Sequence, residues 1–272
     1  MPRIIDIVDC VEAFASPSLQ EKWDNTGWQL RPASVMNECT GAMLCLDVTP
    51  EVVDEAIESG CNLIISHHPL LFHGLKQISD QAPAQRALMR AIREGVYIYS
   101  SHTALDSARQ GVSHRLGEML GLIDMRVLSP RQEDSSTGLG IVGEYASALT
   151  EEEFIGRVKE VYHADAVRRS AGKRAFMESQ GTQPTVGRVA LCSGSGGEFI
   201  PDAIAAGADA YVTSDVRYHD FLDYGKDILI VDTGHFESEI CTKSIFSAII
   251  SEKFPTFALR QSRAELNPVR YV

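Results

Sequence analysis

The sequence predicts an α/β protein in which helices cover sheets of mostly parallel strands. In the first half of the chain, short apolar runs alternate with segments of helical periodicity, as parallel strands joined by crossover helices require. The same alternation resumes after residue 186. The two halves therefore echo each other in layout, although their letters show no strict repeat.

The first half opens with a helix over 4–15, where apolar residues recur at helical spacing. A polar turn between Trp23 and Trp28 follows. Nearly continuous apolar runs then indicate buried strands, and Thr49-Pro50 is a typical helix start. The expected strands are 42–48, 61–65 and 96–99, and the helices after them are 50–59, 82–94 and 109–120.

The second half begins with a polar linker at 130–137, which places the domain boundary between 1–128 and 129–272. Residues 171–185 are polar, with two glycines and one proline, and are expected to form an exposed excursion. A glycine-rich turn at 193–197 lies between a strand and a helix. The expected strands are 138–146, 189–192, 210–212, 228–231 and 256–260, and the expected helices include 150–161, 216–224 and 236–252.

Composition limits the classes of function. The chain has 272 residues and a formal net charge of -12, which argues against broad binding to duplex nucleic acid and suits a site that attracts cations. None of the six cysteines forms a CxxC pair, and several lie in apolar runs, as expected in a reducing compartment. Asp6 and Asp9 interrupt any signal peptide and no long apolar run exists, so a cytoplasmic protein without a membrane span is expected.

Two adjacent histidines, His67 and His68, follow the strand at 61–65. Ligands of parallel sheets bind beyond the carboxyl ends of the strands. Each imidazole could serve one ion of a close metal pair, whose ions lie ~3.5–4 Å apart. The alternative is one core and one surface histidine, because neighbouring strand residues point to opposite faces.

Further candidate ligands follow other strands. Asp106 offers a hard oxygen donor, although a helix cap would also explain it. His235 and Glu239 are four residues apart at a helix start and therefore share a face, whereas a solvated helix start would explain the acid but not His235. Three nitrogen donors, two carboxylates and no thiolate suit an open dinuclear site better than structural zinc.

Other polar residues are weaker candidates. His102 is a candidate general acid or base, or a partner that orients a ligand, and Asp24 is a candidate for orienting a metal-bound water. Asp215 and His219 are candidates for lining the same cleft. A surface or capping role explains each of these equally well. Backbone N–H groups of the turn 193–197 could cradle a phosphate, but a tight turn that needs glycine dihedrals is favoured.

An ordered set of motifs resembles the GTP cyclohydrolase 1 type 2 homologue family, whose members are also described as interacting-factor-three-like, dinuclear-metal-centre proteins. The set reads DNTGWQ, ISHHPLLFHG, SSHTALD, CSGSGG, GADAYVTSDVRYHDF and DTGHFESE. The family's metal ligands correspond to His67, His68, Asp106, His235 and Glu239. The segment 129–186 is too short for the domain that some members insert, so the chain resembles a short-form member. The first motif departs from the usual DNVGLQVG.

The resemblance implies two similar α/β/α layered domains with mixed or mostly parallel sheets and a metal site in the cleft between them. It also implies a ring-shaped homohexamer, a trimer of dimers. The expected function is a hydrolase with two divalent ions per chain (Zn, Fe, Mn or Co) that activate water against a nucleotide-like substrate. Opening of the guanine ring of GTP with loss of formate, or phosphoester hydrolysis, would use such ions. The alternative is a non-catalytic, metal-binding ring that acts as an adaptor for a protein or nucleic-acid partner.

Overall fold

The computed structural model describes residues 1–173, 181 and 183–272, and the chain divides into two compact units. Unit 1 consists of Met1–Ala108 and Ile240–Val269, and unit 2 of Arg109–Glu239 and Arg270–Val272. The fold class is α/β with two separate sheets, as predicted.

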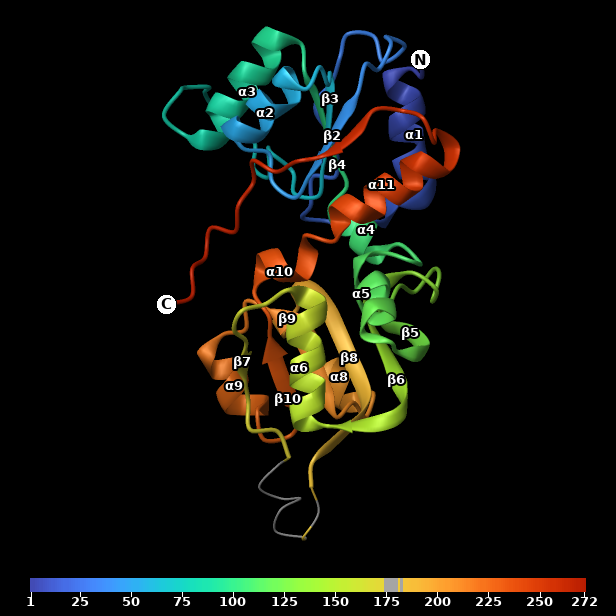
Figure 1. Cartoon of the computed structure of the whole chain (residues 1–272), viewed down its shortest axis with the longest axis vertical. Coiled ribbons are helices and arrows are strands. Elements are labelled where there is room, and N and C mark those ends of the chain that lie inside the picture. Colours follow the sequence, from blue (N-terminus) through green and yellow to red (C-terminus); the bar gives the residue numbers. More distant parts are fainter. Residues whose placement is uncertain (174–180, 182) are drawn as a thin grey trace. The chain divides into compact units, whose positions relative to one another are not determined.

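A five-stranded sheet forms the centre of unit 1, in the order β1-β4-β3-β2-β11 (Figure 1). Strands β2, β3, β4 and β11 are parallel, and β1 is antiparallel to β4. The parallel strands β2 and β3 are buried along their whole length, which explains their continuous apolar runs. The bounds are β1 Gly27–Leu30, β2 Ala42–Cys45, β3 Leu63–Ser66, β4 Tyr97–Ser100 and β11 Leu259–Gln261.

Helices cover both faces of this sheet. On one face, α2 (Pro50–Glu58) and α3 (Pro83–Glu94) pack together and close an apolar core over β2 and β3. On the other face, α1 (Ile4–Phe14) packs against α11 (Thr242–Lys253), which contacts β2 (Figure 1). The short helices η1 (Pro17–Leu19) and α4 (Thr103–Ser107) contact each other. Unit 1 is therefore an α/β/α layered domain.

Unit 2 contains a six-stranded sheet in the order β5-β6-β8-β9-β10-β7. The strands β8, β9 and β10 are parallel, whereas β5, β6 and β7 pair antiparallel to their neighbours, so the sheet is mixed. The bounds are β5 Ile123–Pro130, β6 Gly138–Thr150, β7 Arg168–Arg169, β8 Thr185–Ser195, β9 Ala210–Ser214 and β10 Leu229–Asp232.

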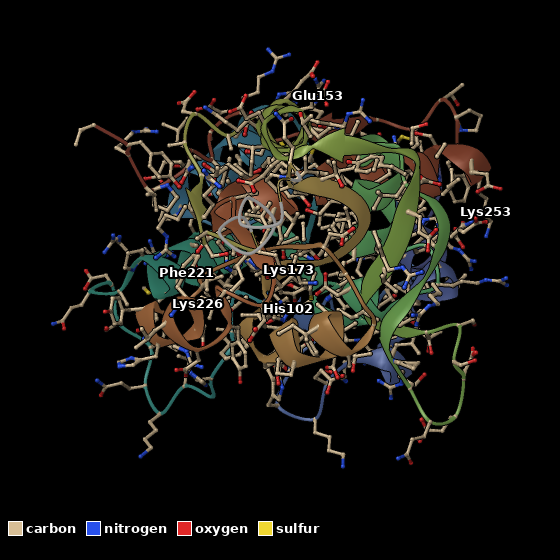
Figure 2. All side chains as sticks on the ribbon, turned by 90° about the horizontal axis from the view of Figure 1, so that it is seen from below. His102, Glu153, Lys173, Phe221, Lys226 and Lys253 are labelled. Carbon is tan, nitrogen blue, oxygen red and sulfur yellow. The ribbon has the colours of Figure 1, made fainter. Side chains whose placement is uncertain are left out.

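The sheet of unit 2 is also covered on both faces. Helices α5 (Val112–Leu120) and α6 (Glu151–Tyr162) pack on β6 and β8, while α8 (Ile200–Ala205) and α9 (Tyr218–Tyr224) close a second core around Tyr211. Helix α6 begins with a capping box, in which Thr150 accepts the N–H of Glu153, labelled in Figure 2, and the Glu153 carboxylate accepts the N–H of Thr150. The short helices η2 (Gly197–Phe199) and α10 (His235–Glu239) complete the unit.

The division into units differs from the predicted domains 1–128 and 129–272. Helix α5 belongs to unit 2 because it packs on β6 and β8. The segment Ile240–Val269 returns to unit 1 because α11 packs against α1 and β11 pairs with β2. The chain therefore crosses between the units more than once, which a single linker at 130–137 does not provide.

Several predicted elements differ in detail. The expected polar turn after Trp23 contains β1, a short strand that is mostly half-buried, and β5 was not predicted because its mixed burial leaves no continuous apolar run. The single helix predicted over 236–252 is two helices, α10 and α11. Most of the predicted excursion 171–185 lies outside the described residues. No helix in the described part of the chain has the length and apolar character that a membrane span needs.

Candidate metal centre

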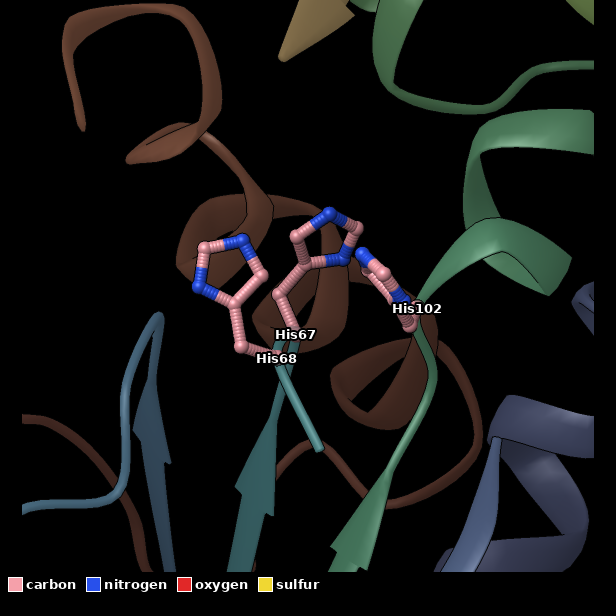
Figure 3. Close-up of side chains that lie close together, drawn as sticks. All are labelled: His67, His68 and His102. Atoms are coloured by element: carbon pink, nitrogen blue, oxygen red, sulfur yellow. The ribbon is translucent and has the colours of Figure 1, made fainter. Parts of the chain in front are cut away.

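The two adjacent histidines lie directly beyond the carboxyl end of β3 (Figure 3). The N–H of His67 donates to Cys45 O at 3.2 Å, and the N–H of His68 donates to Leu46 O at 2.9 Å, so the end of β2 fixes both backbones. The ring of His67 is fully buried and that of His68 is partly exposed. The centroids of the two rings are 5.2 Å apart, so the two side chains do not point to opposite faces of the sheet.

A third histidine joins this pair from the end of β4. The ring of His102 lies 5.3 Å from that of His67 and 5.5 Å from that of His68 (Figure 3). One ring nitrogen from each of the three histidines lies within 4.8 Å of the others, close enough to hold a metal ion. All three residues belong to unit 1. They lie close together because parallel strands place their carboxyl ends at one edge of the sheet.

The orientation of these rings suits ligation through Nε2. In each ring, Nδ1 faces an oxygen that can only accept a hydrogen bond, so a neutral imidazole carries its proton on Nδ1 and a lone pair on Nε2. Histidines that bind metals are oriented in this way. The Nδ1 contacts are His67 to Ser101 O at 3.0 Å, His68 to Asp47 Oδ1 at 2.9 Å, and His102 to Asp24 Oδ1 at 2.7 Å.

Asp106 supplies a carboxylate to the same edge of the sheet. It lies within α4, whose N-cap is His102, so Asp106 does not cap that helix. Its Oδ2 is 3.7 Å from Nε2 of His67. A lone pair on Nε2 would repel this carboxylate, and a cation held by both groups would remove the repulsion. The donor set of unit 1 therefore fits a divalent metal ion.

The side chain of Asp24 is buried and holds His102 in place. Its carboxylate accepts hydrogen bonds from His102, from the N–H and hydroxyl of Thr103, and from the hydroxyl of Thr26. Burial raises the pKa of Asp24, but the hydrogen bonds from His102 and Thr103 outweigh it and hold this pKa well below its usual range. The ionised carboxylate is thus used to orient His102.

The other two predicted ligands form a pair in α10 of unit 2. His235 Nε2 lies 2.9 Å from Glu239 Oε2, and His235 Nδ1 lies 2.7 Å from Asp215 Oδ2. Burial alone lowers the pKa of His235, but the hydrogen bonds to Asp215 and Glu239 more than offset this and raise the pKa to about 10. A metal ion that binds Nε2 must therefore displace a proton.

The glycine-rich turn 193–197 packs against Glu239. Gly194 has φ +62°, and a Cβ atom there would lie 2.1 Å from Glu239 Oε1. The N–H of Gly194 donates to the hydroxyl of Ser238 at 3.0 Å. A turn that requires glycine was predicted for this segment and is confirmed. The absent side chain is what admits the carboxylate of Glu239.

The five predicted ligands are divided between the units, three in unit 1 and two in unit 2. Within each unit the predicted donors lie close together, and joint binding by both sets stays a prediction. The sequence did not reveal Asp47 and Ser101 as partners of the histidines. Asp215 was expected to share a role with His219, but it accepts from His235, whereas His219 packs edge-on against Tyr218. Asp47 was expected within the strand 42–48, but β2 ends at Cys45 and Asp47 lies beyond that end.

Comparison with known proteins identifies the family of the chain. Residues 2–268 match the family model of Duf34/NIF3 (NGG1p interacting factor 3). The chain is 32% identical over 241 residues to a GTP cyclohydrolase 1 type 2 homolog of Clostridium acetobutylicum, covering 87% of this chain and 85% of the relative. It is 31% identical over 237 residues to a Schizosaccharomyces pombe protein named NIF3 homolog, covering 84% and 82%.

Solved structures show the same fold. The crystal structure of Staphylococcus aureus hypothetical protein SA1388 matches with a TM-score of 0.86 and 25% identity, covering 100% of this chain and 99% of that one. A Bacillus cereus protein related to NIF3 matches with a TM-score of 0.87 and 22% identity over 100% of both chains. From the sequence match over nearly its whole length, the chain belongs to the Duf34/NIF3 family.

Proposed function

We propose that this chain is a hydrolase that depends on a pair of divalent metal ions. The ligands would be His67, His68 and Asp106 of unit 1 with His235 and Glu239 of unit 2. The observation that carries the proposal is the common orientation of the three ligand histidines, each of which has Nδ1 on an oxygen acceptor, so that Nε2 is the nitrogen left to bind a metal. The name GTP cyclohydrolase 1 type 2 homolog, which relatives bear, also supports it.

A bound pair of divalent ions would supply Lewis-acid polarisation and lower the pKa of a coordinated water from 15.7 towards ~7. The chain's own contribution is to hold that pair and to move protons. His102 has its Nδ1 fixed on the ionised Asp24, so its Nε2 can accept a proton while the carboxylate stabilises the imidazolium. We assign His102 the role of general acid and base, and Asp24 that of a residue that positions it.

The substrate class we propose is nucleotide-like. The relatives' name suggests opening of the guanine ring of GTP with loss of formate, and hydrolysis of a phosphoester is the closest alternative for the same donors. Six copies of the chain are proposed to form a ring, a trimer of dimers. Five buried thiols suit the reducing cytoplasm, where we expect the protein to act.

Metal analysis and substrate turnover test the proposal together. Protein purified without chelator should contain two divalent ions per chain, and Asp106→Ala or Glu239→Ala should lower that content. His219→Ala is the matched control, because His219 lies on unit 2 without belonging to the ligand set. Release of formate and of phosphate from a panel of nucleotides then identifies the reaction. Fewer than one ion per chain would contradict the metal centre.

The adaptor alternative has a separate outcome. If two ions are bound and no nucleotide is turned over, while Glu239→Ala leaves the assembly intact, the chain is a metal-binding adaptor instead. The mass in solution, measured by light scattering, should be about six times the 29.8 kDa of one chain. A monomer would contradict the proposed ring.

A further inference from the structure

The C-terminal segment of unit 1 runs along β2 towards the histidines. After α11, residues Leu259–Gln261 pair in parallel with Ala42–Leu44, and the N–H of Ser262 continues this pairing by donating to Leu44 O at 2.8 Å (Figure 1). Strand β11 therefore ends level with the carboxyl end of β2. The next residues of the segment lie beside the turn that follows β2.

A buried carboxylate fastens this segment to the end of β2. Glu265 is 3% exposed, and its Oε2 accepts the N–H groups of Leu46 at 2.8 Å and Asp47 at 3.1 Å. Its Oε1 lies 2.7 Å from Nζ of Lys243 on α11. A buried charge is tolerated only with such partners, and here one cation and two backbone donors provide them.

The backbone that Glu265 holds is the same backbone that positions His68. The N–H of His68 donates to Leu46 O at 2.9 Å, and its Nδ1 donates to Asp47 Oδ1 at 2.9 Å. Glu265 therefore holds the backbone of Leu46 and Asp47, the two adjacent residues that His68 contacts.

We propose that Glu265 is a positioning residue for the metal ligand His68, which it reaches through the backbone of Leu46 and Asp47. The inference rests on the proposed metal centre. A glutamine at position 265 has only one acceptor oxygen, so its NH2 group must face either Lys243 or the N–H groups of residues 46 and 47. The Asp47 carboxylate is then held less firmly opposite Nδ1. Loss of a partner that orients a ligand lowers metal affinity about 10–100-fold, and about 10-fold is expected for this indirect case.

The competing explanation is that Glu265 only anchors the C-terminal segment. Glu55 of α2 separates the two explanations, because it fastens the same segment at different residues. Its carboxylate accepts from the hydroxyl of Ser262, from Arg263 N and from Ala264 N, at 2.5–3.2 Å. Glu55→Gln therefore loosens the segment without removing the acceptor of residues 46 and 47.

The experiment compares Glu265→Gln, Glu55→Gln and Asp47→Asn with the wild-type protein. Cobalt(II) is titrated into each metal-stripped full-length chain and followed by its visible absorption, and thermal unfolding is recorded in parallel. Glu265→Gln and Asp47→Asn should weaken the binding of one cobalt ion about 10-fold or more. Glu55→Gln should lower the unfolding temperature and leave the affinity unchanged. Wild-type affinity in Glu265→Gln, or equal weakening in Glu55→Gln, would overturn the inference.

A second readout does not depend on metal binding. Histidine nitrogen spectra of the metal-free protein report which ring nitrogen of His68 carries the proton. The wild-type protein and Glu55→Gln should show the proton on Nδ1, and Glu265→Gln should show exchange between both nitrogens. If the wild-type protein bound no metal, the proposed function would fail. An unchanged His68 spectrum in Glu265→Gln would instead refute the positioning role.

Discussion

Replacing Gly194 by alanine should remove metal binding from unit 2 by displacing one carboxylate. The new Cβ atom would lie 2.1 Å from Oε1 and 3.1 Å from Cδ of Glu239, whereas ordinary contacts of a Cβ begin at 3.4 Å. Glu239 is buried, with 4% of its side chain exposed, so it has little room to yield. The carboxylate must therefore move by roughly 1 Å or more, which is enough to break a metal–oxygen bond of ~2.0–2.2 Å.

The cost in stability has two parts. Residue 194 has φ +62°, and a left-handed conformation costs an alanine about 1–2 kcal/mol. Overpacking against a buried side chain adds about 1–3 kcal/mol. The expected loss is thus roughly 2–5 kcal/mol, and each kcal/mol lowers the unfolding temperature of a domain of this size by about 2–8 °C.

Gly121→Ala is the matched control. Gly121 also has a positive φ, +81°, and a Cβ atom there would lie 3.7 Å from Nη1 of Arg157, which is an ordinary contact distance. This variant should lose only the ~1–2 kcal/mol of backbone strain and keep its metal. Metal content is measured by mass spectrometry of the folded proteins, and unfolding by calorimetry. Full metal occupancy in Gly194→Ala, with stability equal to Gly121→Ala, would refute the reasoning about Glu239.

Three further perturbations test other parts of the molecule. Thr150→Ala removes the capping box of α6 and should lower the free energy of unfolding by about 1 kcal/mol, measured by thermal unfolding. Thr150→Ser keeps the hydroxyl and should lower it less. Burial raises the pKa of Cys39 to about 12, so this thiol should not react with Ellman's reagent at pH 8 until the protein is unfolded, and rapid reaction in the native state would contradict its burial. Asp24→Asn should leave metal content at the wild-type level and slow any hydrolysis about 10²-fold or more, because His102 loses its ionised partner. An unchanged rate would refute the role of Asp24 in positioning His102.

The sequence predicts the central strands well because they are buried on both faces. The run at 228–231 is apolar throughout, those at 42–48 and 61–65 contain one polar residue each, and each run contains a parallel strand. Edge strands lack this signal. In β5, exposed and half-buried residues are mixed, so its periodicity matches neither a buried strand nor a helix.

The limits of the two units could not be predicted from periodicity. An amphipathic helix shows which face it buries but not which sheet covers that face. Helix α5 follows directly on the first half in sequence and packs on the second sheet, and α11 does the reverse. Only the tertiary contacts decide to which unit α5 and α11 belong. A domain boundary placed at the polar linker 130–137 therefore differs from the division into units.

The candidate ligands and their partners differ in how far the sequence specifies them. Beyond the ends of neighbouring parallel strands, polar residues converge, and this rule identified His67, His68 and His102. The rule applies equally to Asp47, which follows β2, but a lone aspartate before a helix is as often a cap. What makes Asp47 different is the 2.9 Å contact with His68 across 21 residues. The orientation of a histidine ring depends on such contacts between residues far apart in the sequence. The sequence therefore predicts which residues can bind a metal, but not which ring nitrogen of a histidine will bind it.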